Sequence, residues 1–135
     1  MDAMLLRVVV AGVLGAHGVG HVMGWMPVLG LARFEGVSSG SWLLSSTAGE
    51  GSARLVAICL FAVPTAGFIA AAVGLLLGQS WWRSVAVAAA ATSLAASALY
   101  PQALPVSSTV GSAAVNVVVL YGILVAQWGA EAATA

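Results

Sequence analysis

Four long runs of apolar residues, separated by short stretches rich in Gly, Ser and Pro, make up most of the chain. The runs cover about residues 5–31, 54–77, 81–100 and 113–128. A helix needs about 20 mainly apolar residues to cross the hydrocarbon core of a bilayer, and each run is near that length. The pattern therefore predicts an all-α polytopic membrane protein: a single domain, residues 1–135, folded as an antiparallel bundle of four transmembrane helices.

The segments between the runs predict the topology. Residues 32–52 are rich in Ser and Gly and form the longest loop, whereas residues 78–80 leave room only for a tight turn. A third connection, residues 101–112, begins with Pro101 and contains Pro105. In an antiparallel bundle of four spans, loops 32–52 and 101–112 lie on the same side of the membrane, and both termini lie on the other.

Composition agrees with a membrane location. Of 135 residues, 61% are hydrophobic and only 6% are charged, and the mean hydropathy is +1.07. A soluble domain carries about a quarter charged residues. The formal net charge of zero, without a basic cluster, argues against binding to nucleic acid. Arg without Lys, together with abundant Ala, Val and Gly, is typical of a GC-rich bacterium, so we expect the bacterial inner membrane.

The arginines leave the orientation in the membrane open. Arg7 and Arg83 lie on the side of the termini, and Arg33 and Arg54 lie on the other, so the positive-inside rule gives a tie. Because the turn at Arg83 is the tightest, we expect cytoplasmic termini.

Two histidines lie inside the first run. His17 and His21 are four residues apart, which places them on one helix face, one turn apart. Ionisable residues inside a membrane are costly and usually functional, so both are candidate catalytic residues. The alternative is that neutral histidines hydrogen-bond to other helices and hold the bundle together.

A stripe of small residues runs beside the histidines. Its members, each four residues apart, are Gly12, Ala16, Gly20 and Gly24. Small side chains let helix backbones approach closely. We therefore expect the stripe to pack against another helix, with the histidines at the edge of that contact.

The other polar residues of the spans gather in the half nearest the two long loops. This asymmetry predicts a cavity with a polar floor that opens towards those loops. The ordinary polarity of helix ends is the alternative, and it explains Arg54 and Tyr100 better than the histidines. Glu50 and Arg54 are also expected to form an i, i+4 ion pair. The residues expected to bind a ligand in the cavity are Asn116, Ser97, Tyr100, Trp25, Glu50 and Arg54.

A metal site is a weaker interpretation of the histidine pair. Tetrahedral zinc needs at least a third ligand, and only Glu50, Cys59 or a second subunit could supply it. Haem is disfavoured because two histidines on one turn cannot take opposite axial positions, unless a dimer shares them. The single Cys59 excludes an intrachain disulfide. We expect no metal and no cofactor.

The first run resembles the opening helix of the DoxX-like small four-helix membrane proteins. The resemblance covers about 20 residues and depends on Arg7, Gly12, His17-Gly18, His21 and Gly24. In that family a Lys commonly occupies the position of His21. Some members are membrane subunits of sulfur or redox oxidoreductases, and distant four-helix relatives bind or isomerise sterols. The resemblance implies a four-helix bundle with a lipophilic or quinone-like partner.

These observations favour an intramembrane pocket for a lipophilic small molecule, with His17 and His21 as proton donor and acceptor. Without a nucleophile triad or a cofactor motif, an enzyme of this kind is limited to proton-transfer reactions such as isomerisation, cyclisation or epoxide opening. One alternative is a small dimeric transporter, although the spans lack an acidic residue to couple proton flow. Another is a non-catalytic subunit of a redox or quinone-linked complex. The expected partners are the lipophilic molecule, membrane lipid and a second copy of the chain.

Overall fold

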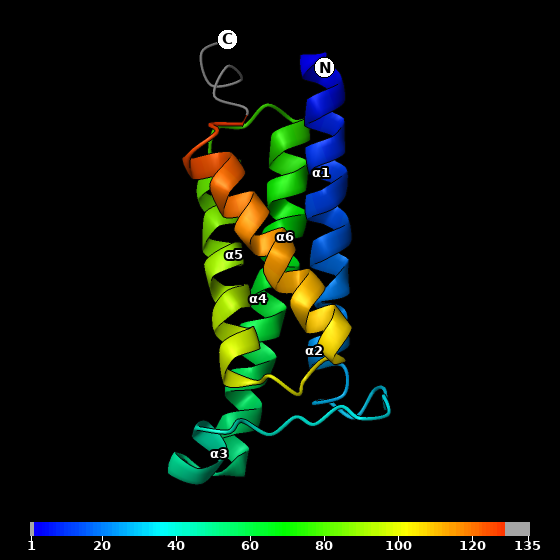
Figure 1. Ribbon diagram of the computed structural model, residues 1–135, viewed down its shortest axis with the longest axis vertical. Coiled ribbons are helices and arrows are strands. Elements are labelled where there is room, and N and C mark those ends of the chain that lie inside the picture. The colour runs from blue at the N-terminus through cyan, green and yellow to red at the C-terminus, as the bar shows by residue number, and fades with distance from the viewer. Residues whose placement is uncertain (1, 129–135) are drawn as a thin grey trace.

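The computed structural model describes residues 2–128 and shows a bundle of long helices (Figure 1). The first span has two parts, because a break at His21 separates α1 from the short α2. Each span is long and apolar enough to cross a membrane, which confirms the all-α, four-span architecture and indicates an integral membrane protein. The helices are α1 (Ala3–Gly20), α2 (Val22–Trp25), α3 (Leu44–Thr47), α4 (Glu50–Leu76), α5 (Trp82–Leu99) and α6 (Val106–Leu124).

Several helix ends differ from those predicted. The first span ends at Trp25 and not near residue 31, because Pro27 disfavours helical continuation and residues 26–30 form a turn. The last span begins at Val106, seven residues earlier than predicted, and ends at Leu124. Pro105 directly precedes it, where the missing proline N–H removes no intrahelical bond. The Ser and Thr residues after Pro105 therefore belong to a helix and not to a loop.

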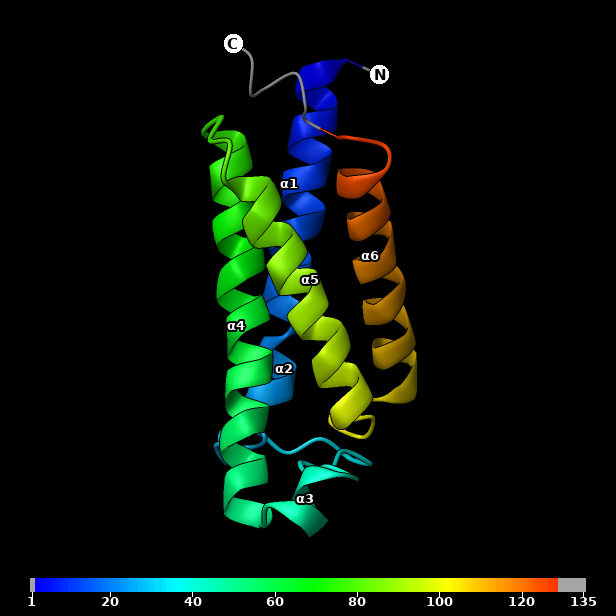
Figure 2. The same ribbon diagram turned by 90° about the vertical axis from the view of Figure 1, so that its left-hand side faces the viewer.

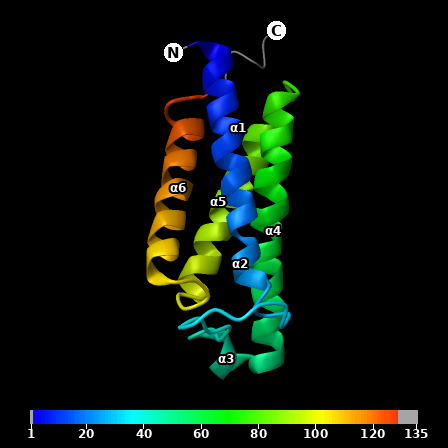
Figure 3. The same cartoon turned by 90° about the vertical axis from the view of Figure 1, so that its right-hand side faces the viewer.

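The helices pack unequally. The long α4 contacts α1, α2, α3 and α5, whereas α6 packs mainly on α5. Figure 1 shows α6 crossing the bundle obliquely, from its beginning at the level of α2 to its end at the level where α5 starts. Figures 2 and 3 show the start of α1 and the end of α6 at one end of the bundle, and α3 with both long connections at the other.

Hydrogen bonds join the two long connections. The Ser38 amide donates to the Gln102 carbonyl at 2.8 Å, and the Ser41 hydroxyl donates to the Leu99 carbonyl at 2.9 Å. The Trp42 indole donates to the Ala98 carbonyl at 2.8 Å. The first long connection is thereby fastened to the end of α5.

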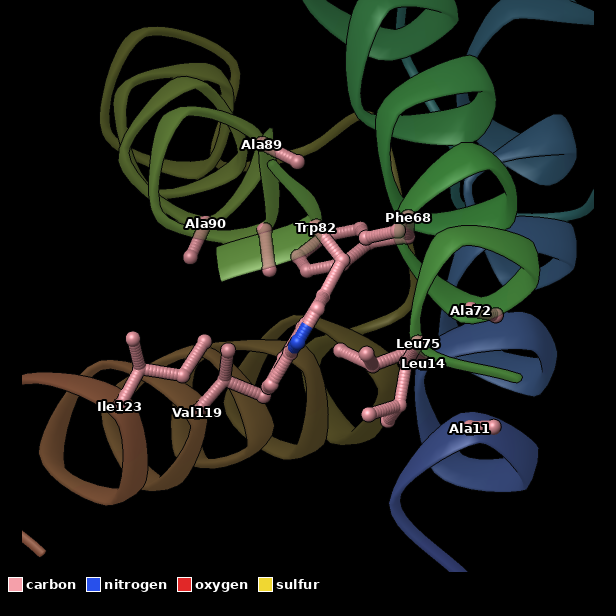
Figure 4. Packing of buried hydrophobic residues seen from close by; sticks show 12 residues of the cluster. Ala11, Leu14, Phe68, Ala72, Leu75, Trp82, Ala89, Ala90, Val119 and Ile123 are labelled. Atoms are coloured by element: carbon pink, nitrogen blue, oxygen red, sulfur yellow. The ribbon is translucent and has the colours of Figure 1, made fainter. Parts of the chain in front are cut away.

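Two clusters of buried apolar side chains fill the interior. Figure 4 shows the first cluster, in which Trp82 of α5, 2% exposed, lies among side chains from α1, α4 and α6 such as Leu14, Phe68 and Val119. The second cluster lies nearer the long connections and contains Phe61 and Tyr100. The histidine rings lie at the level between the two clusters, since His21 faces both Phe61 and Phe68.

The small-residue stripe does not make the close contact that was predicted. Gly12, Ala16 and Gly20 are exposed, and a Cβ added at Gly12 or Gly20 would meet nothing within 4 Å. Only Gly24 is buried, against the ring of Phe61. The face of α1 that points inward instead carries the buried Leu14, and both histidines lie on this face.

The close approach of α1 to α4 occurs at Gly18. A Cβ there would lie 3.0 Å from the Phe68 Cβ and 3.1 Å from the Thr65 carbonyl oxygen. Gly18 lies between the two histidines in sequence, so the lack of a side chain brings the histidine region of α1 directly against α4. This contact determines how deeply the histidines enter the bundle.

Candidate functional site

Four polar side chains from three helices form one hydrogen-bonded chain in the interior. The His17 Nε2 and Asn116 Oδ1 atoms are 3.0 Å apart, and Asn116 Nδ2 donates to Ser93 Oγ at 2.6 Å. Ser93 Oγ is 3.0 Å from His21 Nε2. Asn116 and Ser93 are 0% exposed and His21 is 2% exposed. The chain therefore links α1, α6 and α5, with three of its members buried and His17 partly exposed.

The break in the first span helps to position His21. Its amide bonds the Gly18 carbonyl at 3.2 Å, and the Gly24 amide bonds the His21 carbonyl at 2.9 Å. Both are i to i−3 bonds, the tighter 3₁₀ type, which in mid-helix marks a local departure from α geometry. His21 therefore lies at a bend in the helix, with its ring directed to Ser93 of α5.

The orientation of the Asn116 amide determines the protonation of both rings. Because Asn116 Oδ1 can only accept, neutral His17 carries its proton on Nε2 and leaves Nδ1 as a lone pair. Ser93 Oγ accepts from Asn116 Nδ2 and can donate its own hydroxyl proton to His21 Nε2. In that arrangement neutral His21 carries its proton on Nδ1. One histidine thus presents a basic Nδ1, and the other presents an Nδ1–H donor.

Two buried polar atoms have no hydrogen-bond partner among residues 2–128. They are His21 Nδ1 and Ser112 Oγ, the second of which lies one turn before Asn116 on α6. A buried donor or acceptor without a partner costs about 1–3 kcal/mol. Such atoms in a native fold need an explanation, and a functional role is one of the ordinary ones.

Aromatic rings surround the histidines. The His21 ring is stacked on Phe68 with centroids 6.0 Å apart and planes at 7°, and the His17 ring meets Phe68 edge-on at 4.7 Å. The two imidazoles themselves have centroids 4.8 Å apart. In this apolar surrounding, hydrogen bonds and partial charges act with little screening.

The other predicted ligand-binding residues lie outside this chain. Ser97 is nearest, because its hydroxyl donates to the Ser93 carbonyl at 3.0 Å. The Trp25 indole donates to the Thr65 hydroxyl at 3.3 Å. The Tyr100 hydroxyl donates to the Ala53 carbonyl at 2.6 Å, and burial raises the pKa of Tyr100, so the phenol keeps its proton. Tyr100 therefore ties α5 to α4 in the second apolar cluster.

The predicted ion pair between Glu50 and Arg54 is wrong. Arg54 donates from Nη2 to the Val28 carbonyl at 2.7 Å, and Glu50 is exposed in the first turn of α4. The carbonyls of the turn after α2 offer the guanidinium a fixed acceptor, which the flexible Glu50 side chain does not. Arg54 thus anchors the turn 26–30 to α4 and lies away from the histidines.

Of the polar residues expected to floor a cavity, Asn116 bonds within the histidine chain, and Ser97, Tyr100, Trp25 and Arg54 bond to other groups of the protein. A shallow groove of about 530 Å³ lies elsewhere, between α5 and α6, and is lined by Arg83, Ser84, Val87, Ala88, Ala91, Ile123, Leu124 and Gln127. Across residues 2–128, no three His, Cys, Asp or Glu side chains are grouped so that they could hold a metal ion.

Two members of the site were not predicted from the sequence. Ser93 shares a helix face with Ser97, but nothing in the pattern distinguishes it as the residue that meets a histidine. Ser112 falls in the predicted loop 101–112, so its place one turn from Asn116 was not evident. Recognising that a helix begins directly after Pro105 would have placed Ser112 and Asn116 on one face.

The arrangement can hold a polar group against two imidazoles of opposite character within an apolar interior. Comparison of the chain with protein-family models, with curated proteins and with solved structures found no match. The functional argument therefore starts from this geometry.

Proposed function

We propose that the protein binds a lipophilic small molecule inside the membrane and moves a proton on it with His17, assisted by His21. The observation that carries the proposal is the hydrogen-bonded chain through Asn116 and Ser93. Each ring uses only Nε2 in this chain, so the Nδ1 atoms of both imidazoles remain free to meet a ligand. The depth of this chain within the bundle favours a substrate that arrives through lipid and not from water.

The proton inventory of the two rings limits the reaction. Neutral His17 can accept, at its Nδ1 atom, a proton from a carbon of the substrate and so become an imidazolium. It can then return that proton to another carbon of the same substrate molecule. Neutral His21 cannot release its Nδ1 proton fully without becoming an anion, so it acts as a hydrogen-bond donor to charge that develops on the substrate. This pattern fits isomerisation by proton transfer, and it needs no cofactor.

A deuterium-incorporation screen tests the proposal without a known substrate. The purified protein is incubated in D₂O with a lipid extract of its native membranes, and the lipids are analysed by mass spectrometry. We expect a lipophilic species that gains one mass unit with the wild-type protein. His17→Gln retains an N–H donor for Asn116 but has no ring base, so it should remain folded and give no incorporation. Incorporation by His17→Gln at the wild-type rate, or none by the wild type, would contradict the proposal.

A second candidate function is supported by the outer face of α1. Gly12, Ala16 and Gly20 are exposed in a span whose exposed surface faces lipid, and small residues there favour packing of a partner helix. This feature supports a subunit role or a homodimer, in line with the resemblance to DoxX-like proteins. Gly20→Leu should then abolish association on native gels while the chain stays folded. Unchanged association would remove this candidate.

A further inference from the structure

The groove between α5 and α6 is an accessible space on the outer surface of the bundle, apart from the histidines. Its volume is about 530 Å³, within the range of about 300–1,000 Å³ that small-molecule sites occupy. Figure 2 shows the start of α5 and the end of α6, which supply its lining, at the same end of the bundle. No member of the hydrogen-bonded chain lines the groove, so its occupant is separate from the proposed proton transfer.

The lining of the groove has a polar part and an apolar part. The polar residues are Arg83, Ser84 and Gln127, and the apolar ones are Val87, Ala88, Ala91, Ile123 and Leu124. Arg83 and Ser84 belong to the first turn of α5, beside Trp81, which is 45% exposed. Exposed Trp side chains at the end of a span lie at the level of the lipid headgroups. Ala91 lies eight residues after Arg83 on α5, and therefore about 12 Å deeper in the membrane.

Arg83 is held at the groove with its charge uncompensated by the lining. Its Nη2 donates to the Ile123 carbonyl at 2.7 Å, which fixes the guanidinium between the two helices. A carbonyl accepts a hydrogen bond without neutralising the charge, and a guanidinium has five N–H donors. Among residues 2–128 the acids are Asp2, Glu35 and Glu50, and none of them lines the groove. The polar part therefore presents a cation and further N–H donors to an occupant.

We propose that the groove binds an anionic phospholipid, with the phosphate against Arg83 and Ser84 and one acyl chain along the apolar lining. Guanidinium donors match the geometry of phosphate oxygens, and the Ser84 hydroxyl and the Gln127 amide add uncharged donors. A headgroup with an ammonium would bring a second positive charge to Arg83, and the lining holds no acid to receive it. Phosphatidylglycerol therefore fits better than phosphatidylethanolamine, and a water-soluble phosphate would leave the apolar part unfilled.

Native mass spectrometry of the delipidated protein in detergent tests the headgroup site. The probes are dioleoylphosphatidylglycerol, dioleoylphosphatidylethanolamine with the same acyl chains, and glycerol 1-phosphate as a soluble headgroup. We expect one phosphatidylglycerol to bind saturably and more tightly than the ethanolamine lipid, and the soluble phosphate not to bind. Arg83→Gln should weaken phosphatidylglycerol binding by about fivefold to tenfold, the effect of one cationic side chain at a membrane surface. Arg83→Lys keeps the charge and should keep the preference for phosphatidylglycerol.

A second substitution tests the acyl-chain part and leaves Arg83 intact. Ala91→Leu places a larger side chain in the apolar part of the groove and should weaken phosphatidylglycerol binding by about fivefold or more. Ala95→Leu is the matched control, because Ala95 is exposed one turn further along α5 and does not line the groove. It should bind the lipid like the wild type. Thermal unfolding of each variant distinguishes lost binding from lost folding.

The proposal fails if the wild type binds the two lipids equally, or if Ala91→Leu binds phosphatidylglycerol as the wild type does. Unchanged binding by Arg83→Gln would also overturn it. If Arg83→Gln does not fold, Arg83→Lys and Ala91→Leu decide the result. A dimer that dissociates in Ala91→Leu while phosphatidylglycerol stays bound would assign the groove to a second copy of the chain and overturn the lipid site.

Discussion

Asn116 of α6 donates a hydrogen bond of 2.6 Å to Ser93 of α5, and its amide oxygen lies 3.0 Å from His17 Nε2 of α1. One amide thereby joins three helices. The amide has a fixed donor end and a fixed acceptor end, so its orientation makes His17 the donor in their hydrogen bond. With the Ser93 hydroxyl donating to His21, the two histidines take opposite character.

Asn116→Ala should reduce the free energy of unfolding. Interhelical hydrogen bonds in membranes average about 0.6 kcal/mol and reach about 1.7 kcal/mol, and this substitution removes two of them and leaves a small cavity. We expect a loss of about 1–3 kcal/mol, measured by SDS titration followed by circular dichroism. Ser108→Ala, at an exposed position near the start of α6, serves as the control and should change stability by less than about 0.5 kcal/mol. Equal stability of the two variants would show that the chain does not hold the helices together.

Glycine substitutions in α1 should separate the buried face from the exposed one. Gly18→Ala places a Cβ 3.0 Å from Phe68 Cβ and 3.1 Å from a backbone carbonyl, and should cost about 1–3 kcal/mol through overpacking. Gly20→Ala meets nothing within 4 Å, so the stability of the single chain should be unchanged or slightly higher. Thermal unfolding of both variants in the same detergent measures the difference. If Gly20→Ala is the more damaging, the exposed stripe is an interface that the fold of one chain requires.

Arg54 and Glu50 should behave independently. Because Arg54 donates to the Val28 carbonyl, Arg54→Ala should lower the melting temperature and expose the turn 26–30 to protease. Glu50→Gln should leave both unchanged, since the carboxylate is exposed and Arg54 is bonded elsewhere. A coupling energy of more than about 0.5 kcal/mol between the two residues in a double-mutant cycle would show that they do form an ion pair.

Both long connections should be accessible from one side of the membrane. Cys59 is the only cysteine, so Cys59→Ala gives a cysteine-free background for single cysteines at Ser39 and Ser108. Hydrogen bonds from Ser38 to Gln102 and from Ser41 to Leu99 place these connections together at one end of the bundle. An impermeant maleimide added to sealed, oriented vesicles should label both cysteines or neither. Labelling of only one would contradict the arrangement.

The sequence was sufficient to predict the number of membrane spans and their antiparallel order. Apolar runs of membrane length leave few alternatives, because every backbone polar group in lipid must be bonded internally. Helix ends were less predictable. Residues after Pro105 have a loop-like composition, but in a membrane protein Ser and Thr are tolerated in helices, and α6 begins directly after that proline.

The candidate site was predictable only in part. His17, His21 and Asn116 were evident as costly polar residues within spans, and the structure brings these three together. Which face of α1 points inward was not evident from the sequence, because Gly18 and Gly20 are equally small. Only the packing of Phe68 of α4 against Gly18 shows that the Gly18 face is the buried one. Ser93 is one of several serines on α5. Which of them meets His21 depends on how α5 is oriented about its own axis relative to α1.

The nitrogen-bound protons of the two histidines provide the most direct test of the account. The chain contains only two histidines, so ¹⁵N-histidine labelling of a protein without a histidine tag gives just four ring-nitrogen signals. At neutral pH we expect one ring with its proton on Nε2, assigned to His17, and the other with its proton on Nδ1, assigned to His21. Asn116→Ala should abolish this difference. Finding both rings in the same tautomer, or both as imidazolium, in the wild-type protein would contradict the proposed base and donor pair.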